Sequence, residues 1–229
     1  MAKRTKKKSA TSKNVNPHDA FFKSTFSYPE VVRSYIEKFM DESLVKHLDL
    51  DGLELENNSF ITPKLEEFYS DLVWKTRYKT TEIKISFLFE HKSYPVPYPH
   101  VQLLRYILEH LEQQIKAKEP LTVIIPIIIY HGSSEWQVRQ FWEYFEGIDD
   151  VLKAFIPIFQ YQLTDLSRYS DAELIEMGIG KLLNVFLAMI HVRDAKYILE
   201  NYETIFIFAK EKDLQDTRFG NLFHSIYLE

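Results

Sequence analysis

The feature that most constrains this fold is an apolar run at the centre of the chain, Leu121–Tyr130. It reads Leu-Thr-Val-Ile-Ile-Pro-Ile-Ile-Ile-Tyr, and most of its side chains are β-branched. A run of this kind is typical of a strand that is covered on both faces of its sheet. It is too short to cross a bilayer. The fold must therefore place other elements on both sides of a sheet that contains this strand.

A long amphipathic helix is expected before this strand, after the proline-rich turn Tyr94–Pro99. The helix should extend over about 17 residues, because its apolar side chains recur at helical spacing. These side chains form a heptad-like stripe of Val101, Leu104, Leu108, Leu111 and Ile115. A strand over Glu82–Lys92, this helix and the buried strand together imply a crossover between parallel strands.

The N-terminal half adds a helix and further strands. The helix should start at Pro29, a favoured first helical residue, and strands should flank the turn Asp51-Gly52. Strands over Glu67–Tyr78 and Glu82–Lys92, joined by the turn Lys79–Thr81, are typical of a hairpin. We therefore predict an α/β (α+β) fold with a mixed central sheet flanked by helices.

The chain is expected to contain three segments. Residues 1–15 form a disordered basic tail, residues 16–147 the folded core, and residues 148–229 a mainly helical C-terminal extension. Beyond Trp136 the apolar spacing is mainly helical. The helical stretches are Glu135–Phe145, Asp149–Ile156, Asp171–His191 and Lys196–Lys210.

Composition excludes several kinds of site. The chain of 229 residues has no cysteine, so disulfides, thiolate zinc sites and cysteine nucleophiles are excluded, and oxygen or imidazole must hold any metal. It has six glycines and neither a P-loop nor a GxGxxG pattern, which argues against nucleotide-hydrolysing classes of that kind. No apolar segment suits a membrane span or a signal peptide, so we expect a cytoplasmic protein without a membrane partner.

Charge is distributed unevenly along the chain. The formal net charge is −5, yet residues 1–13 carry six Lys and Arg and no acid. Residues 64–106 sum to +2, whereas the segments on either side of them are acidic. A positive stretch can bring a polyanion to one place, although a sum this small also arises by chance. The tail either contacts phosphates or only aids solubility.

Two acids and a lysine on the predicted hairpin are the strongest candidates for chemistry. The hairpin brings Asp71 beside Glu90, and Lys92 shares the face of Glu90 because side chains alternate along a strand. Two carboxylates at a strand end suit Mg²⁺, with Mn²⁺ as the alternative ion. Such an ion lowers the pKa of a bound water. Lys92 is then placed to orient that water or to neutralise a phosphate.

An acid followed two residues later by a lysine is a common pattern and carries little weight by itself. Here Glu90 and Lys92 end an otherwise apolar strand, and Asp71 lies within an apolar stretch. Ionic residues in such positions are unusual unless they have a partner. The pattern therefore favours a site.

Five blocks of sequence, taken in order, resemble a known family. They are His18-Asp19 with Phe22-Lys23, Tyr69-Ser70-Asp71-Leu72, Phe89-Glu90-His91-Lys92-Ser93, Gln102-Leu103-Leu104-Arg105-Tyr106, and Ile125–Gly132. Through these blocks, from about residue 16 to at least Phe145, the chain resembles the recombination-promoting nucleases, also called YhgA-like transposases. That family is part of the PD-(D/E)xK nuclease superfamily.

The resemblance implies a restriction-endonuclease-like core of helix, three-stranded meander, helix and strand. It also implies a Mg²⁺-dependent DNA endonuclease linked to recombination or mobile DNA, with DNA as its partner. Asp71 and Glu90 then match the metal ligands, and Lys92 matches the catalytic lysine. Gln102 matches a polar catalytic residue of the following helix, and the backbone carbonyl of His91 completes the metal shell.

Departures and alternatives remain open. Ser70 replaces the proline of the superfamily motif, at a position that varies. The pair His18-Asp19 is similar to part of an HD-type phosphohydrolase site, but a helix cap or a structural role is favoured because no further set of His and Asp accompanies it.

A catalytically weak DNA-binding or interaction module on the same fold is the main alternative, with a homodimer through the C-terminal helices. A transposase acting by strand transfer is disfavoured, because Glu90 and Lys92 suit hydrolysis better.

Overall fold

The computed structural model describes residues 22, 25–56, 71–90, 96–132 and 134–180, together with positions 182, 186, 187, 190, 191, 196 and 200. Residues 71 and 86–90 are described by their backbone. The predicted tail, residues 1–15, lies outside the described residues, as do the outer ends of the two predicted hairpin strands, residues 67–70 and 91–92.

The described strands form one mixed five-stranded sheet in the order β1-β2-β3-β4-β5. They are β1 (Glu54–Leu55), β2 (Asp71–Tyr78), β3 (Thr81–Glu90), β4 (Val123–Tyr130) and β5 (Gln162–Asp165). The β1–β2 and β2–β3 pairs are antiparallel, whereas β4 pairs parallel with both β3 and β5. The predicted hairpin, the crossover and the mixed sheet are therefore confirmed.

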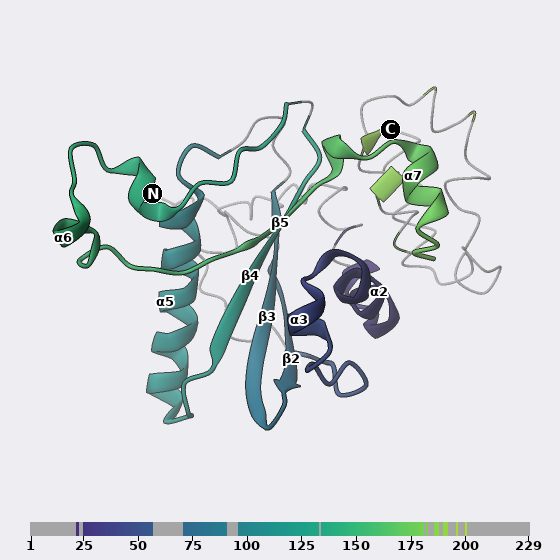
Figure 1. Cartoon of the computed structure of the whole chain (residues 1–229). Coiled ribbons are helices and arrows are strands. Elements are labelled where there is room, and N and C mark those ends of the chain that lie inside the picture. Colours follow the sequence, from purple (N-terminus) through teal and green to yellow (C-terminus); the bar gives the residue numbers. More distant parts are fainter. Residues whose placement is uncertain are drawn as a thin grey trace, which may run out of the picture.

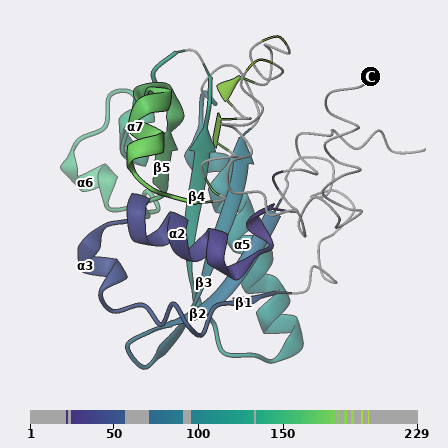
Figure 2. The ribbon, with the colours of Figure 1, turned by 90° about the vertical axis from the view of Figure 1, so that its right-hand side faces the viewer.

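Helices cover both faces of this sheet (Figure 1). On one face lie α2 (Pro29–Phe39) and the short α3 (Glu42–Val45), and on the other lies α5 (Pro99–Ala117), as the rotated view also shows (Figure 2). The strand β4 thus has a layer on each side. The second half of β4, residues 126–130, is buried, which explains why this half is apolar, whereas Val123 at the start of the strand is 61% exposed.

Each face of the sheet has its own hydrophobic core. The core on the α2 side includes Val32, Ile36, Trp74, Ile85 and Ile127. The core on the α5 side includes Val73, Leu103, Tyr106, Ile128 and Tyr130. Neighbours along a strand, such as Val73 and Trp74, belong to opposite cores because successive side chains point to opposite faces.

Local signals account for where several elements begin and end. Pro29 begins α2, at a helical position where its missing N–H costs no hydrogen bond. The β2–β3 turn contains Lys79 with a φ of 55°, and α5 ends at Lys118 with a φ of 57°. Left-handed residues of this kind reverse the chain at a tight turn or close a helix. Among the described helices, none combines the length and the apolar character that a membrane crossing requires.

The apolar stripe of α5 is not the face that packs on the sheet. The buried residues of the helix are Pro99, His100, Leu103, Tyr106 and Gln114. Three residues of the predicted stripe, Val101, Leu108 and Ile115, are 56%, 51% and 62% exposed. The inner face includes two polar residues: the His100 ring stacks on Phe141, and the Gln114 side-chain amide donates a hydrogen bond to the Thr122 hydroxyl. A pattern of apolar residues alone does not detect such partners.

Residues after 147 contribute to both the sheet and the core. The strand β5 was not predicted, and the two helices predicted over 135–156 are reduced to the 3-10 turn η1 (Phe141–Tyr144) and the single turn α6 (Asp150–Lys153). Leu174 of α7 (Asp171–Glu176) is buried in the α2-side core together with Phe186. Residues on both sides of the predicted boundary therefore share one core.

Candidate active site

The backbone register brings positions 71 and 90 to one face of the sheet. In the antiparallel β2–β3 pair, Asp71 lies directly opposite Leu88. Residues opposite each other share a face, and so do residues two apart on a strand, so Asp71, Leu88 and Glu90 lie on the same face. Such diagonal neighbours are about 7–8 Å apart, close enough for two carboxylates to reach one divalent ion. The register thus gives both positions the arrangement that a shared site requires.

This face is the one that α5 covers. Val73, two residues from Asp71, is buried together with Leu103 of the helix. The C-terminal part of α5 is tied to the chain just before β4, where the Gln114 side-chain amide donates a 2.8 Å hydrogen bond to the Thr122 hydroxyl. Because β3 and β4 run parallel, the helix that joins them must begin where β3 ends. The first turn of α5 therefore lies at the same end of the sheet as the end of β3.

The predicted site residues differ in what the structure describes of them. Asp71 and Glu90 are placed by backbone register, and Gln102 lies half-buried in the first turn of α5. His91 and Lys92 lie outside the described residues, in the segment that directly follows β3. Among the described side chains, no group of three or more His, Asp and Glu is arranged to hold a metal ion. The metal site therefore remains a prediction for positions 71 and 90.

A third acidic residue, Asp165, lies in line with position 90. Glu90 pairs with Tyr130 of β4, and Tyr130 pairs with Asp165 of β5. Paired residues share a face of the sheet, so Asp165 lies on the face of Glu90, about 10 Å away across two strand spacings. Asp165 is not among the residues predicted from sequence, because the strand that carries it is short and gives little periodic signal.

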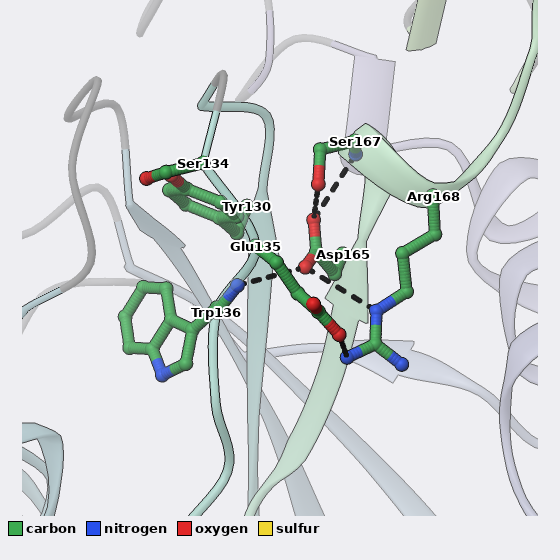
Figure 3. Close-up of polar contacts among 7 residues, drawn as sticks. All are labelled: Tyr130, Ser134, Glu135, Trp136, Asp165, Ser167 and Arg168. Carbon is green, nitrogen blue, oxygen red and sulfur yellow. Dashed lines mark hydrogen bonds and ion pairs between the residues drawn. The ribbon is translucent and has the colours of Figure 1, made fainter.

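The Asp165 carboxylate is fully engaged in binding its own loops (Figure 3). One oxygen accepts hydrogen bonds from the Ser167 backbone N–H at 3.0 Å and from its hydroxyl at 2.6 Å. The other accepts from the Trp136 backbone N–H at 3.1 Å and lies 3.5 Å from Arg168 Nε. Its side chain is only 3% exposed. A buried carboxylate with donors on both oxygens is a structural anchor, which here ties the loop after β4 to the end of β5.

The same loop contains a glycine that its surroundings require. A Cβ atom at Gly132 would lie 2.0 Å from the hydroxyl oxygen of Tyr130. Tyr130 is completely buried, and its hydroxyl lies 3.1 Å from the Ser134 hydroxyl. The buried ring packs edge-on against Trp136, so moving it aside would disturb the core, and the close approach favours glycine at position 132. The contact between Gly132 and Tyr130 therefore constrains the path of the loop that follows β4, next to the end of β3.

A cavity of about 590 Å³ lies near the opposite end of the α5-covered face, and its lining includes Glu56, Lys75 and Lys84. The buried Lys84 donates a 2.7 Å hydrogen bond to Glu56 Oε1, and Lys75 Nζ lies 3.4 Å from the same oxygen. Burial raises the pKa of Glu56, but the hydrogen bonds and charges of Lys84 and Lys75 together outweigh it, so this pKa lies below its usual value. Lys84 precedes Glu90 by about 20 Å of strand. The cavity is therefore separate from the candidate site.

His110 in the same lining is a neutral histidine. Burial lowers the pKa of His110 to about 4, and the positive charge of Lys84 adds to this shift. The ring packs edge-on against Tyr106, with 4.5 Å between the ring centroids. An imidazole with so low a pKa carries no charge near neutral pH. His110 therefore contributes to side-chain packing in the folded chain.

Comparison with known proteins supplies relatives over most of the chain. Recombination-promoting nuclease RpnD of Escherichia coli O157:H7 is 27% identical over 210 residues, which is 90% of this chain and 80% of the relative. Recombination-promoting nuclease RpnA of Escherichia coli K12 is 27% identical over 86% of this chain and 66% of its own length. The Inactive recombination-promoting nuclease-like protein RpnE of the same strain is also 27% identical, over 87% of this chain and 68% of the relative.

Family membership follows from a match over most of the sequence. No solved structure matches the chain significantly. The model of the family described as "Putative transposase, YhgA-like" matches residues 16–217. This range includes all five sequence blocks and continues through β5 and α7. The chain therefore belongs to the YhgA-like transposase family, in which it is similar to proteins named recombination-promoting nucleases.

Proposed function

We propose that this protein is a metal-dependent DNA endonuclease that hydrolyses phosphodiester bonds in recombination or in the movement of mobile DNA. The observation that carries the proposal is the β2–β3 register, in which Asp71 opposite Leu88 brings positions 71 and 90 to one face. This face meets the first turn of α5 at the end of β3. The names of the relatives RpnD and RpnA support the reaction class.

A restriction-endonuclease-like core is part of the proposal. Apart from the single-turn helix α3 before β1, the described elements follow one another as the helix α2, the antiparallel strands β1 to β3, the helix α5 and the strand β4. This is the order of helix, three-stranded meander, helix and strand that the resemblance implies. In such a core the two acids lie on adjacent strands and the polar residue on the next helix, as Asp71, Glu90 and Gln102 do here.

The proposed donors fit Mg²⁺ or Mn²⁺. Asp71, Glu90 and the backbone carbonyl of His91 all offer oxygen, which these hard ions prefer, and the chain has no cysteine to favour a softer metal. When bound, such an ion polarises the scissile phosphate and makes a coordinated water more acidic. The remaining metal positions are left for water and phosphate.

Lys92 and Gln102 complete the proposed site. We propose that the ammonium group of Lys92, which the two-residue spacing from Glu90 predicts for the same face, orients the attacking water or offsets the charge that develops on the phosphate. The Gln102 amide positions the water or a phosphate oxygen from the first turn of α5. In this proposal the two acids bind the metal ion, and the lysine acts on the attacking water or on the phosphate.

The test is cleavage of supercoiled and linear duplex DNA with Mg²⁺ or Mn²⁺ by the wild type, Asp71→Ala and Glu90→Ala. Each alanine variant should lose at least about 100-fold in rate, because each lacks a metal ligand. Glu82→Ala is the matched control, since it removes an exposed acid from the same strand and the same face. Wild-type cleavage by Asp71→Ala or Glu90→Ala would show that the site is wrongly assigned.

A second candidate is a DNA-binding or interaction module that keeps the fold without appreciable cleavage. It is favoured by one finding: RpnE, a relative named inactive, is as similar to this chain as the relatives named nucleases. The same assay separates the two candidates. A wild-type chain that binds DNA and the metal, yet leaves both substrates uncut, supports the second.

A further inference from the structure

Beside the face of α5 that packs on the sheet, the helix has an apolar stripe that the described residues leave largely exposed. We call its residues the outer stripe: Val101, Leu104, Leu108, Leu111 and Ile115. Three of them are more than half exposed, at 56% for Val101, 51% for Leu108 and 62% for Ile115. The two others are half-buried. Large apolar side chains gathered on one exposed helix face are typical of an interaction surface.

The spacing of the outer stripe is that of a helix that packs against another helix. Its residues are separated alternately by three and four positions, so they occupy the a and d positions of two heptads. The inner face of α5 already packs on the sheet through Leu103 and Tyr106. The outer stripe is therefore a second packing face on one helix.

We propose that the outer stripe packs antiparallel against the outer stripe of a second copy of this chain, forming a two-fold symmetric dimer. A seam of alternating three and four spacing is self-complementary, because the same side chains serve as knobs and as holes. A two-fold axis uses the same patch on both copies and closes the assembly at two. The contact lies on α5 and not on the C-terminal helices.

Charges that flank the outer stripe support a second copy in the antiparallel direction. Arg105 and Glu112 are exposed and lie at equivalent positions, each directly after a leucine of the stripe. If Leu108 of one copy packs level with Leu111 of the other, Arg105 of each copy lies beside Glu112 of the other. The symmetry produces this ion pair twice. The same helix thus carries both halves of a complementary charge pattern.

A parallel pairing lacks this complementarity. There the heptad positions bring Arg105 beside His100 and Glu112 beside Ile107, and neither pair joins opposite charges. The antiparallel direction also places the first turns of the two α5 helices at opposite ends of the seam. Positions 102 of the two copies would then be offset by about 22 Å along the helix axis, at 1.5 Å per residue.

The first test is sedimentation velocity of the full chain at micromolar concentration. The wild type should be a dimer, and Leu108→Glu should raise the dissociation constant at least about 100-fold, because it buries two unpaired charges in the seam. The variant should keep its helical circular dichroism, since Leu108 is 51% exposed in the single chain. Ile158→Glu is the control, because it makes the same change at an 85% exposed residue outside α5. A monomeric wild type, or a dimer that only Ile158→Glu dissociates, overturns the proposal.

The second test reverses the flanking charges. Arg105→Glu and Glu112→Arg should each weaken the dimer about tenfold, because each replaces two attractive pairs with two repulsive ones. The double variant should recover wild-type affinity, since it exchanges the two charges. If the double variant dimerised no more tightly than the weaker of the two single variants, the result would show that the helices do not pair antiparallel. Neither test depends on DNA cleavage, so a failed nuclease assay leaves both informative.

Discussion

The Asp165 carboxylate accepts a 3.1 Å hydrogen bond from the backbone N–H of Trp136, across 29 positions of sequence. This bond joins the end of β5 to the loop that leaves β4. The loop begins beside the end of β3, because Tyr130 at the end of β4 pairs with Glu90. Asp165 therefore stabilises the loop next to the candidate site. Both of its carboxylate oxygens already interact with donor groups of the protein.

Replacing Asp165 should destabilise the protein without removing a catalytic group. Asp165→Ala leaves the buried backbone N–H of Trp136 without its acceptor and removes the acceptor of the Ser167 N–H and hydroxyl, so the free energy of unfolding should fall by about 2–4 kcal/mol. Ser167→Ala loses a single donor and should cost about 1 kcal/mol. Urea unfolding followed by circular dichroism measures both. Full stability of Asp165→Ala together with complete loss of cleavage would instead make Asp165 part of the reaction.

Gly132→Ala should destabilise the fold through a steric clash. The added Cβ would lie 2.0 Å from the Tyr130 hydroxyl oxygen, and the buried ring is held in place. Overpacking of this kind costs about 1–3 kcal/mol, and a contact of 2.0 Å places the expected loss in the upper part of that range. The control is Gly147→Ala, because a Cβ added there meets no atom within 4 Å. The positive φ of this position, 70°, gives the variant some backbone strain. This strain should cost about 1 kcal/mol. An equal loss of stability in the two variants would argue against the clash.

His110 should make the stability depend on pH below neutrality. Its pKa is lowered to about 4 in the folded chain by burial and by Lys84, against about 6.5 in the unfolded chain. As the pH falls from 7 to 5, the unfolded chain binds a proton that the folded chain does not. The free energy of unfolding should therefore fall by up to about 2 kcal/mol over this interval.

His110→Phe should remove the part of this pH dependence that His110 contributes, whereas the lowered pKa values of His47 and His100 remain. Phenylalanine keeps a ring beside Tyr106 and does not titrate. Urea unfolding at several pH values between 7 and 5 should give a flatter profile for the variant than for the wild type. Gln113→Ala, which alters a non-titrating residue of the same cavity lining, should keep the wild-type slope. Parallel profiles of wild type and His110→Phe would contradict the assignment.

Lys92→Ala should separate catalysis from metal binding. The cleavage rate should fall at least about 100-fold, because the positive charge at the phosphate is lost. Mn²⁺ affinity, measured by isothermal titration calorimetry, should stay near the wild-type value since both carboxylates remain. Lys38→Ala, an exposed lysine of α2, is the control for both measurements. A loss of Mn²⁺ affinity as large as that of Glu90→Ala would make Lys92 a structural partner of the acids.

Much of the layout was predictable from sequence, because it depends on local periodicity. The β-branched run before Tyr130 predicts a doubly covered strand, and Pro29 marks the start of a helix. Polar residues at Lys79–Thr81 separate two strand patterns, which predicts the hairpin. For the candidate site, the two-residue period of β3 places Glu90 on a defined face. These features follow from side-chain chemistry within a few residues of each position.

Only the tertiary structure decided which surfaces meet. It left the outer stripe of α5 exposed, because the helix packs on the sheet through Leu103 and Tyr106 instead. It paired Asp71 with Leu88, and it made Asp165 an anchor at the end of a short strand that carries little periodic signal. The physical reason is the same in each case. Pairing and burial depend on contacts between residues far apart in the chain, whereas periodicity reports only the conformation of each segment.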